Sequence, residues 1–146
     1  MSASNGSVMG WDIGGAHLKA ATLDDARTLH SLQLLPCPLW QGLEHLTRAL
    51  TQALAAQAAA PRAHAITMTG ELCDLFCDRV TGVAAIVHTV SAAVAPLTPQ
   101  VYVCDRGLVV NAAPLAVASM NWHAMARALA ARVPDALLID IGSTTT

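Results

Sequence analysis

Aromatic and charged residues are scarce in this chain of 146 residues. Phe, Tyr and Trp make up 3% of the sequence, and Asp, Glu, Lys and Arg together make up 12%. The formal net charge is −2, and the basic residues are scattered singly along the chain. The sequence therefore lacks the basic patch by which proteins bind nucleic acid, and we expect no nucleic-acid partner.

Long unbroken apolar runs are also absent, although apolar residues make up 54% of the chain. The two most apolar stretches, 82–97 and 107–120, contain polar side chains and a proline. A bilayer requires roughly 20 consecutive apolar residues, so we expect no membrane-spanning helix and no membrane partner. Residues 1–7 have neither a basic cluster nor an apolar segment, so they do not resemble a secretory signal and we expect a disordered leader.

The cysteines form no Cys-x-x-Cys pair. Cys37, Cys73, Cys77 and Cys104 lie in apolar or helical surroundings, which is typical of reduced thiols in a cytoplasmic protein. A zinc site built from Cys73, Cys77 and a nearby His is the alternative, but the spacing matches no common structural zinc pattern. We therefore expect buried thiols and a cytoplasmic location.

The order of the apolar segments predicts an α/β fold. Alternating polar and apolar residues predict three consecutive antiparallel strands, and later apolar runs predict helices between further strands. The expected strands are 8–13, 16–23, 28–35, 65–69, 101–104, 108–110 and 136–141. The expected helical segments are 39–60, 71–76, 82–95 and 115–133. The resulting order, β-β-β-α-β-α-β-α and a last strand, predicts a mixed sheet covered by helices.

The same pattern predicts how the strands pair and where the domains lie. We expect strand 8–13 to lie beside strand 65–69 and parallel to it, with helix 39–60 as the crossover between them. We expect residues 8–134 to form one lobe. Residues 135–146 are expected to begin a second lobe, because they repeat the pattern of the first strand.

Two segments place an acid near the end of an apolar strand, with glycine soon after it. They are Trp11-Asp12-Ile-Gly-Gly15 and Ile139-Asp140-Ile-Gly-Ser-Thr-Thr145. Glycine lets the backbone approach a phosphate and point N–H groups at it, and Ser and Thr hydroxyls add donors. A nearby acid can hold Mg²⁺ or act as a base. The repeat predicts two phosphate loops, and two unrelated turns capped by Asp are the alternative.

These turns and the element order resemble the actin/hexokinase/Hsp70 superfamily, and within it the hydantoinase/oxoprolinase-like branch. Four segments are similar to one family, the tetrahydromethanopterin-linked C1-transfer pathway proteins, which resemble the synthase of methanofuran biosynthesis that joins an aminomethylfuran to γ-glutamyltyramine. The segments are Asp12-Ile-Gly-Gly-Ala-His-Leu-Lys-Ala-Ala21, Thr67-Met-Thr-Gly-Glu-Leu72, Ala118-Ser-Met-Asn-Trp122 and Asp140-Ile-Gly-Ser-Thr-Thr-Thr146.

The resemblance implies a ribonuclease H-like (actin-like ATPase) domain and a transferase activity. The substrate would be a small phosphorylated molecule, a furan activated as its diphosphate. The phenol oxygen of a glutamyl-tyramine or tyrosine would attack the furan methylene, and pyrophosphate would leave with assistance from Mg²⁺. ATP is a further cofactor that the superfamily leaves open. Family members continue past the second loop, so we expect this chain alone to be inactive.

The candidate site residues follow from the motifs and the resemblance. Asp12, Glu71 and Asp140 are the candidate catalytic residues, and Asp12 and Asp140 are also the candidate metal ligands. The candidate phosphate-binding residues are Gly14, Gly15, His17, Lys19, Gly142, Ser143, Thr144 and Thr145. Glu71 could act as a base toward the phenol or cap the next helix, and Lys19 and His17 could contact phosphate or face solvent.

Two other functions stay open at this point. One is an ATP-dependent amidohydrolase of the hydantoinase or oxoprolinase kind, which shares the Asp-x-Gly-Gly loop. The other is a non-catalytic nucleotide-binding protein that acts as a switch by closing its two lobes. The sequence also leaves open whether the protein forms a homo-oligomer.

Overall fold

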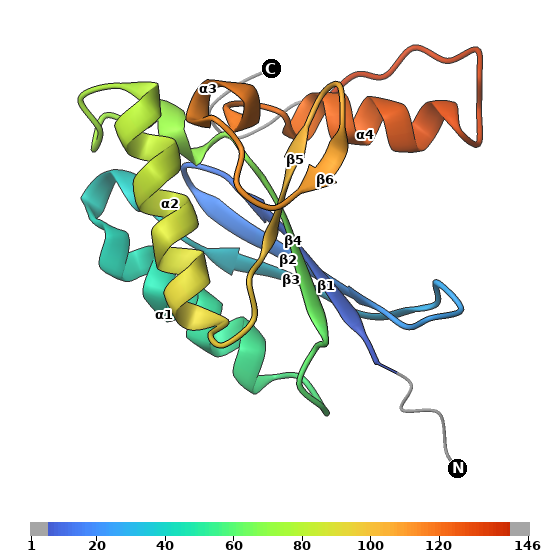
Figure 1. Ribbon diagram of the computed structural model, residues 1–146, viewed down its shortest axis with the longest axis horizontal. Coiled ribbons are helices and arrows are strands. Elements are labelled where there is room, and N and C mark those ends of the chain that lie inside the picture. Colours follow the sequence, from blue (N-terminus) through green and yellow to red (C-terminus); the bar gives the residue numbers. More distant parts are fainter. Residues whose placement is uncertain (1–5, 141–146) are drawn as a thin grey trace.

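A mixed six-stranded open sheet forms the centre of the computed structural model, which describes residues 6–140 (Figure 1). The strands are β1 (Val8–Ile13), β2 (His17–Leu23), β3 (Leu29–Pro36), β4 (Ala63–Met68), β5 (Gln100–Val103) and β6 (Gly107–Val109). In the described part of the chain, the α-helices are α1 (Leu43–Ala55), α2 (Arg79–Ala93), α3 (Pro114–Val117) and α4 (Asn121–Ala130). Two short 3₁₀ helices, η1 (Leu39–Gln41) and η2 (Gly70–Leu72), lie between them. The predicted α/β class with a mixed sheet is therefore confirmed.

The strands lie in the order β3-β2-β1-β4-β5-β6. The first three strands are antiparallel neighbours, β1 is parallel to β4, and β4 is parallel to β5. The short strand β6 pairs antiparallel with β5. Both the predicted antiparallel start and the predicted parallel pairing of the first and fourth strands are confirmed.

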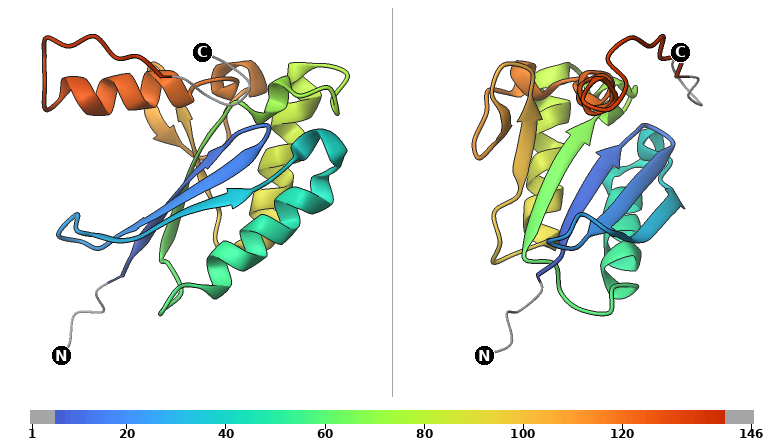
Figure 2. Two further views of the ribbon diagram at one scale, coloured as in Figure 1. Left: turned by 180° about the vertical axis from the view of Figure 1, so that it is seen from behind. Right: turned by 90° about the vertical axis from the view of Figure 1, so that its right-hand side faces the viewer.

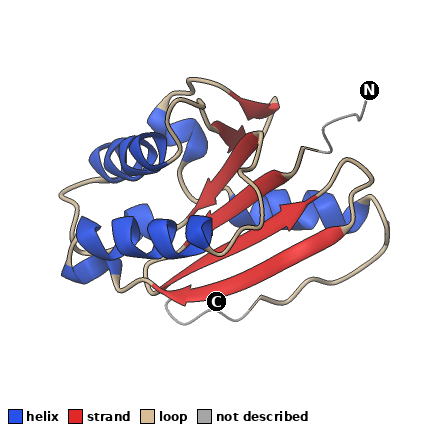
Figure 3. Ribbon diagram, turned by 90° about the horizontal axis from the view of Figure 1, so that it is seen from below, coloured by secondary structure: helices blue, strands red, loops and turns tan. Residues whose placement is uncertain are grey.

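One face of the sheet packs on α1 and α2 and forms the core. Met9, Trp11 and Ile13 alternate along β1 and are at most 2% exposed. Leu46 and Leu50 lie four residues apart on α1, which places both on the side of the helix that meets the sheet. Figures 2 and 3 show helices on both sides of the strands, and α1 and α2 lie together on one side.

The opposite face of the sheet carries small and polar side chains together with exposed leucines, among them Leu32 and Leu34 of β3. Residues that alternate with the core positions, such as Gly10 and Asp12 on β1, lie on this face and are partly exposed. Within residues 6–140, α4 meets this face at the end of β5, where His123 contacts Tyr102. The candidate site described below lies on this face and at the ends of β1 and β4.

Helix α1 is shorter than predicted at both ends. Gly42, with a φ of 146°, separates the helix from η1, and the helix ends at Ala55 although residues up to Ala60 were expected. Residues 56–60 are Ala and Gln, which favour helix but have no large apolar side chain to bury. Since most helical stability comes from packing, propensity alone does not extend α1.

Helix α2 begins earlier than predicted, at Arg79 and not residue 82. The Asp78 carboxylate accepts a hydrogen bond from the Thr81 backbone N–H at 2.8 Å and caps the helix. The helical segment expected over 71–76 is only the single turn of η2, from Gly70 to Leu72. Strand β1 has the predicted bounds, and the bounds of β2 to β6 lie within two residues of the predicted ones.

The single helix predicted over 115–133 is wrong. The segment forms α3 and α4, which are separated at residues 118–120, and α4 ends at Ala130. Ser119 in this break has a φ of 55°, a left-handed conformation that a helix cannot contain. Pro114 does occupy the start of α3, as predicted.

The strand predicted over 136–141 is absent across its described residues, 136–140. Leu137 and Ile139 are 87% and 69% exposed, and no strand in the described part of the chain pairs with them. A strand without a neighbour leaves its backbone groups unpaired, so the apolar sequence alone does not produce one. Residue 141 and most of the leader expected over 1–7 lie outside the described residues.

No helix within residues 6–140 has the length and apolar character needed to cross a bilayer.

Candidate functional site

The loops that follow the parallel strands β1 and β4 pack directly against each other. The Thr69 backbone N–H donates to the Ile13 carbonyl at 3.0 Å. A Cβ added at Gly70 would lie 3.2 Å from the Gly14 carbonyl oxygen and 2.9 Å from the Leu39 side chain. Only glycine therefore fits at position 70 without pushing the loops apart. The Asp-x-Gly-Gly segment and the Thr67–Leu72 segment, far apart in sequence, meet at this point.

The Gly14–Gly15 turn is fixed by hydrogen bonds on both sides. The Gly14 N–H donates to the His17 carbonyl at 3.0 Å, and the Gly15 carbonyl accepts from the Leu39 N–H at 2.9 Å. Because the Gly14 N–H is already bonded, Gly15 and Ala16 are the residues of this turn whose N–H groups could serve an anion. His17 begins β2 and is partly exposed, on the same side of the strand as Lys19.

Asp12 and Lys19 face each other directly across β1 and β2. The register of the hairpin pairs the two residues, and the Lys19 ammonium lies 3.0 Å from Asp12 Oδ2. The Lys19 side chain is 56% exposed and the Asp12 side chain 28%. The second oxygen, Asp12 Oδ1, is buried and accepts no hydrogen bond. Such an oxygen is costly to leave unpartnered, and a cation or a donor from a ligand would satisfy it.

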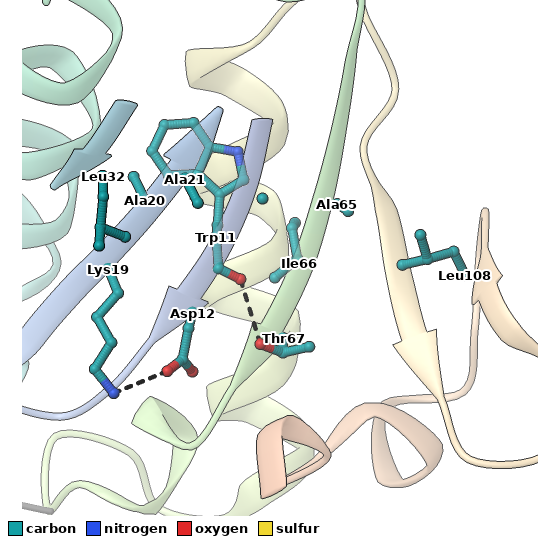
Figure 4. A pocket seen from close by; sticks show the side chains of 11 residues that line it. Trp11, Asp12, Lys19, Ala20, Ala21, Leu32, Ala65, Ile66, Thr67 and Leu108 are labelled. Carbon is teal, nitrogen blue, oxygen red and sulfur yellow. Dashed lines mark hydrogen bonds and ion pairs between the residues drawn. The ribbon is translucent and has the colours of Figure 1, made fainter. Parts of the chain in front are cut away.

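A shallow pocket of about 250 Å³ opens beside this pair, on the face of the sheet opposite α1 and α2 (Figure 4). Asp12, Lys19 and Thr67 supply its polar side chains. The rest of the lining is small or apolar, namely Gly10, Trp11, Ala20, Ala21, Leu32, Ala65, Ile66 and Leu108. Figure 4 shows the Asp12 and Lys19 side chains directed toward one another from adjacent strands.

A second pocket, of about 410 Å³, brings three of the four sequence motifs together. Its lining includes Thr69 and Leu72 from the loop after β4, Ser119 from the break before α4, Trp122 from the first turn of α4, and Asp140. Asp140 itself is exposed and lies outside any strand. Asp140 therefore lies near the loop after β4, although the strand expected to carry it is absent.

Glu71 lies under α2 and is inaccessible to solvent. Its side chain is 0% exposed, and Oε1 accepts a hydrogen bond from the Ser119 hydroxyl at 2.6 Å. Arg79 Nη2 lies 3.4 Å from the same oxygen and donates to the Ser119 hydroxyl oxygen at 2.7 Å. The other oxygen, Oε2, is buried without a hydrogen-bond partner. A Cβ at Gly82 would come within 2.9 Å of the Glu71 side chain, so α2 packs closely over this acid.

Ser119 and Arg79 are site residues that sequence reasoning missed. Ser119 links the buried carboxylate to the pocket that contains Asp140, and its left-handed backbone aims the hydroxyl at Glu71. The only sequence signal was its place in the Ala118–Trp122 segment. Arg79 was not detectable, because its partner is eight residues away and separated from it by turns.

Three ionisable groups near the candidate site have shifted pKa values. Burial raises the pKa of the Cys37 thiol to about 11, with the neighbouring Cys73 as a smaller cause. Burial lowers the pKa of His64, whose Nδ1 accepts a hydrogen bond from the Trp11 indole N–H at 3.2 Å. The hydrogen bond from the Thr81 backbone lowers the pKa of Asp78. Cys37 is thus buried as expected. The expectation of buried thiols is wrong for the others, because Cys73 is partly exposed and Cys77 and Cys104 are exposed.

A metal cage is not present among residues 6–140, because no three His, Cys, Asp or Glu side chains gather there. The alternative of a zinc site from Cys73, Cys77 and a nearby His therefore has no support. Mg²⁺ requires fewer protein ligands, since it binds through one or two carboxylates and completes its shell with substrate phosphates and water. The unpartnered Asp12 oxygen fits a Mg²⁺ ion held mainly by a diphosphate.

The second predicted phosphate loop cannot be placed. Gly142, Ser143, Thr144 and Thr145 lie outside the described residues, and Asp140 is the last residue described.

No protein-family model matches this sequence, and no curated protein matches it either. The family resemblance therefore depends on the four motifs themselves.

Proposed function

We propose that this protein is a transferase of one-carbon-carrier cofactor biosynthesis. It would join an aminomethylfuran diphosphate to the phenol of a glutamyl-tyramine or tyrosine and release pyrophosphate. The observation that supports the proposal most is the Asp12–Lys19 pair, with its unpartnered buried oxygen, beside a glycine turn that packs on the loop after β4. We propose with it that the α/β fold is of the actin-like, ribonuclease H-like kind.

The Asp12–Lys19 pair offers both charges that a metal diphosphate needs. Asp12 would hold Mg²⁺ or its water shell through the oxygen that now lacks a partner. Lys19 is more than half exposed, so its ammonium can turn from Asp12 to a phosphate oxygen at small cost. When bound, Mg²⁺ neutralises charge on the departing pyrophosphate. Gly15 and Ala16 would add backbone donors to the same group.

The phenol side of the reaction would involve Glu71 and Ser119. In the reaction the phenol loses its proton, a C–O bond forms at the furan methylene, and the bond to the diphosphate breaks. Glu71 is buried, so it would act on a proton through the Ser119 hydroxyl, which lines the second pocket. The short 2.6 Å hydrogen bond between the two groups suits such a transfer.

The test uses the natural full-length protein with aminomethylfuran diphosphate, γ-glutamyltyramine or tyrosine, and Mg²⁺. We expect release of pyrophosphate that requires both organic substrates. Asp12→Asn keeps the shape of the side chain but removes its charge, and should lower turnover by roughly two orders of magnitude. Asp25→Asn, a matched change at the far end of the β2–β3 hairpin, should leave turnover unchanged.

Two results would overturn the proposal. Normal turnover in Asp12→Asn would remove the metal role of this residue. Hydrolysis of ATP coupled to opening of a cyclic amide, without pyrophosphate release from the furan, would establish the amidohydrolase alternative.

A further inference from the structure

A cysteine, a histidine and a tyrosine meet at the end of β5, away from the proposed diphosphate site. Cys104 follows β5 and is exposed, and His123 lies in the first turn of α4. Cys104 Sγ is 3.2 Å from His123 Nε2, and Tyr102 Oη is 2.9 Å from His123 Nδ1. Both nitrogens of the imidazole are therefore engaged, one by a thiol and one by a phenol.

The neighbours of His123 fix the orientation of its ring. Tyr102 is 8% exposed, so its hydroxyl is a fixed partner on the Nδ1 side. Trp122 packs against the ring edge to face, with centroids 5.5 Å apart and planes at 87°. In the tautomer with its proton on Nδ1, the imidazole donates to the phenol oxygen, and its Nε2 lone pair accepts the thiol proton. A nucleophile, a base and a group that orients the base are thus aligned.

We propose that Cys104 is a site of thiol modification by small disulfides, with His123 as its base and Tyr102 as a positioning residue. The Cys104 sulfur attacks one sulfur of R–S–S–R while its proton moves to His123 Nε2. A new S–S bond forms to Cys104, and the second sulfur leaves as R–S⁻, which takes the proton from the imidazolium. The disulfide supplies the oxidation, so atoms and electrons balance.

The other cysteines provide a contrast within the same chain. Cys77 is also exposed, but its thiol donates to the Asp78 carboxylate at 3.5 Å and not to an imidazole. Cys37 is fully buried, and its pKa is raised to about 11. The expected order of reactivity is therefore Cys104, then Cys77, then Cys37.

The experiment compares Cys104 and Cys77 in one protein. The native chain is treated at neutral pH with 4,4′-dithiodipyridine, and peptide mass spectrometry follows each cysteine. A free thiol is only a few per cent thiolate at this pH, so we expect Cys104 to react about tenfold faster than Cys77 or more. In guanidinium the two rates should agree within about twofold, because the unfolded chain has no His123 contact.

Three variants identify the base. His123→Gln should slow Cys104 to the rate of Cys77 without changing Cys77. Tyr102→Phe keeps the ring but removes the hydroxyl, and should slow Cys104 by a smaller factor. His88→Gln, at an exposed histidine of α2, is the control and should change neither rate.

Equal native rates at Cys104 and Cys77, or an unchanged Cys104 rate in folded His123→Gln, would overturn the proposal. If circular dichroism shows that His123→Gln does not fold, the native and unfolded rate ratios of the wild-type chain decide the question.

Discussion

Asp12 and Glu71 are two carboxylates in similar positions with different surroundings. Asp12 lies near the end of β1, and Glu71 follows β4, the parallel neighbour of β1. In each carboxylate one oxygen contacts a basic side chain, and the other is buried without a hydrogen-bond partner. The Asp12 side chain is 28% exposed beside an exposed lysine, whereas the Glu71 side chain is completely buried.

This difference indicates which acid can meet a ligand. An exposed ion pair contributes little to stability and can exchange its partner at small cost, so in our proposal Asp12 releases Lys19 and binds a metal. A buried carboxylate is retained only when its hydrogen bonds offset the loss of hydration. Glu71 connects the loop after β4, the start of α2 and the break before α4, and any chemistry it performs passes through Ser119.

The largest expected effect is on stability, from Glu71→Ala. The change removes the acceptor of the Ser119 hydroxyl and leaves a cavity under α2, so we expect a loss of about 2–4 kcal/mol in the free energy of unfolding. Urea denaturation measures it. Glu44→Ala, at an exposed acid in the first turn of α1, is the control and should stay within about 0.5 kcal/mol of the wild type. A similarly small effect for Glu71→Ala would show that its burial is not structural.

A smaller effect on the free energy of unfolding is expected from protonation of His64. This histidine is buried on the face of the sheet that α1 and α2 cover. Its pKa in the folded protein is lowered by burial from 6.5, so below pH 6.5 the unfolded chain binds the proton more tightly. The contribution of His64 to stability is therefore present above pH 6.5 and lost as the pH falls below it. We expect up to about 1 kcal/mol of loss between pH 6.5 and 5.5 from this group.

Urea denaturation at pH 7.5, 6.5 and 5.5 measures this loss. The loss specific to His64 should disappear in His64→Gln. An identical pH dependence in the variant and the wild type would mean that burial of His64 does not affect its protonation.

The smallest expected effect is from Asp12→Asn and Lys19→Met. Both side chains are partly solvated, so each change should alter the free energy of unfolding by less than about 1 kcal/mol. The same urea denaturation applies. If Asp12→Asn lowers the free energy of unfolding by more than about 2 kcal/mol, Asp12 is a structural acid as Glu71 is.

The pairing of the first three strands was predictable because it depends on local patterns. Alternation along residues 8–35 and the Gly14–Gly15 turn determine the hairpin and its register, and this register places Lys19 opposite Asp12. The prediction of one long helix over 115–133 is wrong because of a contact between residues far apart in the sequence. Ser119 interrupts it to reach Glu71, 48 residues earlier in the chain, and no local pattern encodes that contact.

The candidate site was predictable in part for the same reason. Asp12 and its glycine turn form a short motif, and the structure brings this turn against the Thr67–Leu72 segment. The burial of Glu71 depends on α2 packing at Gly82, which the sequence around Glu71 does not reveal. For Asp140, an apolar run alone could not show whether a neighbouring strand is present, and the expected strand is absent over 136–140.

The most direct test of the Asp12 site is calorimetric titration of pyrophosphate into the chain, with and without Mg²⁺. Its three samples are the wild type, Asp12→Asn and the control Asp25→Asn. We expect wild-type binding that requires Mg²⁺, weakened about tenfold or more in Asp12→Asn, since one lost charge contact of about 1.4 kcal/mol changes Kd tenfold. Asp25→Asn should bind as the wild type does. Equal binding by Asp12→Asn and the wild type, or no Mg²⁺-dependent binding by the wild type, would contradict the assignment of Asp12 to a metal diphosphate.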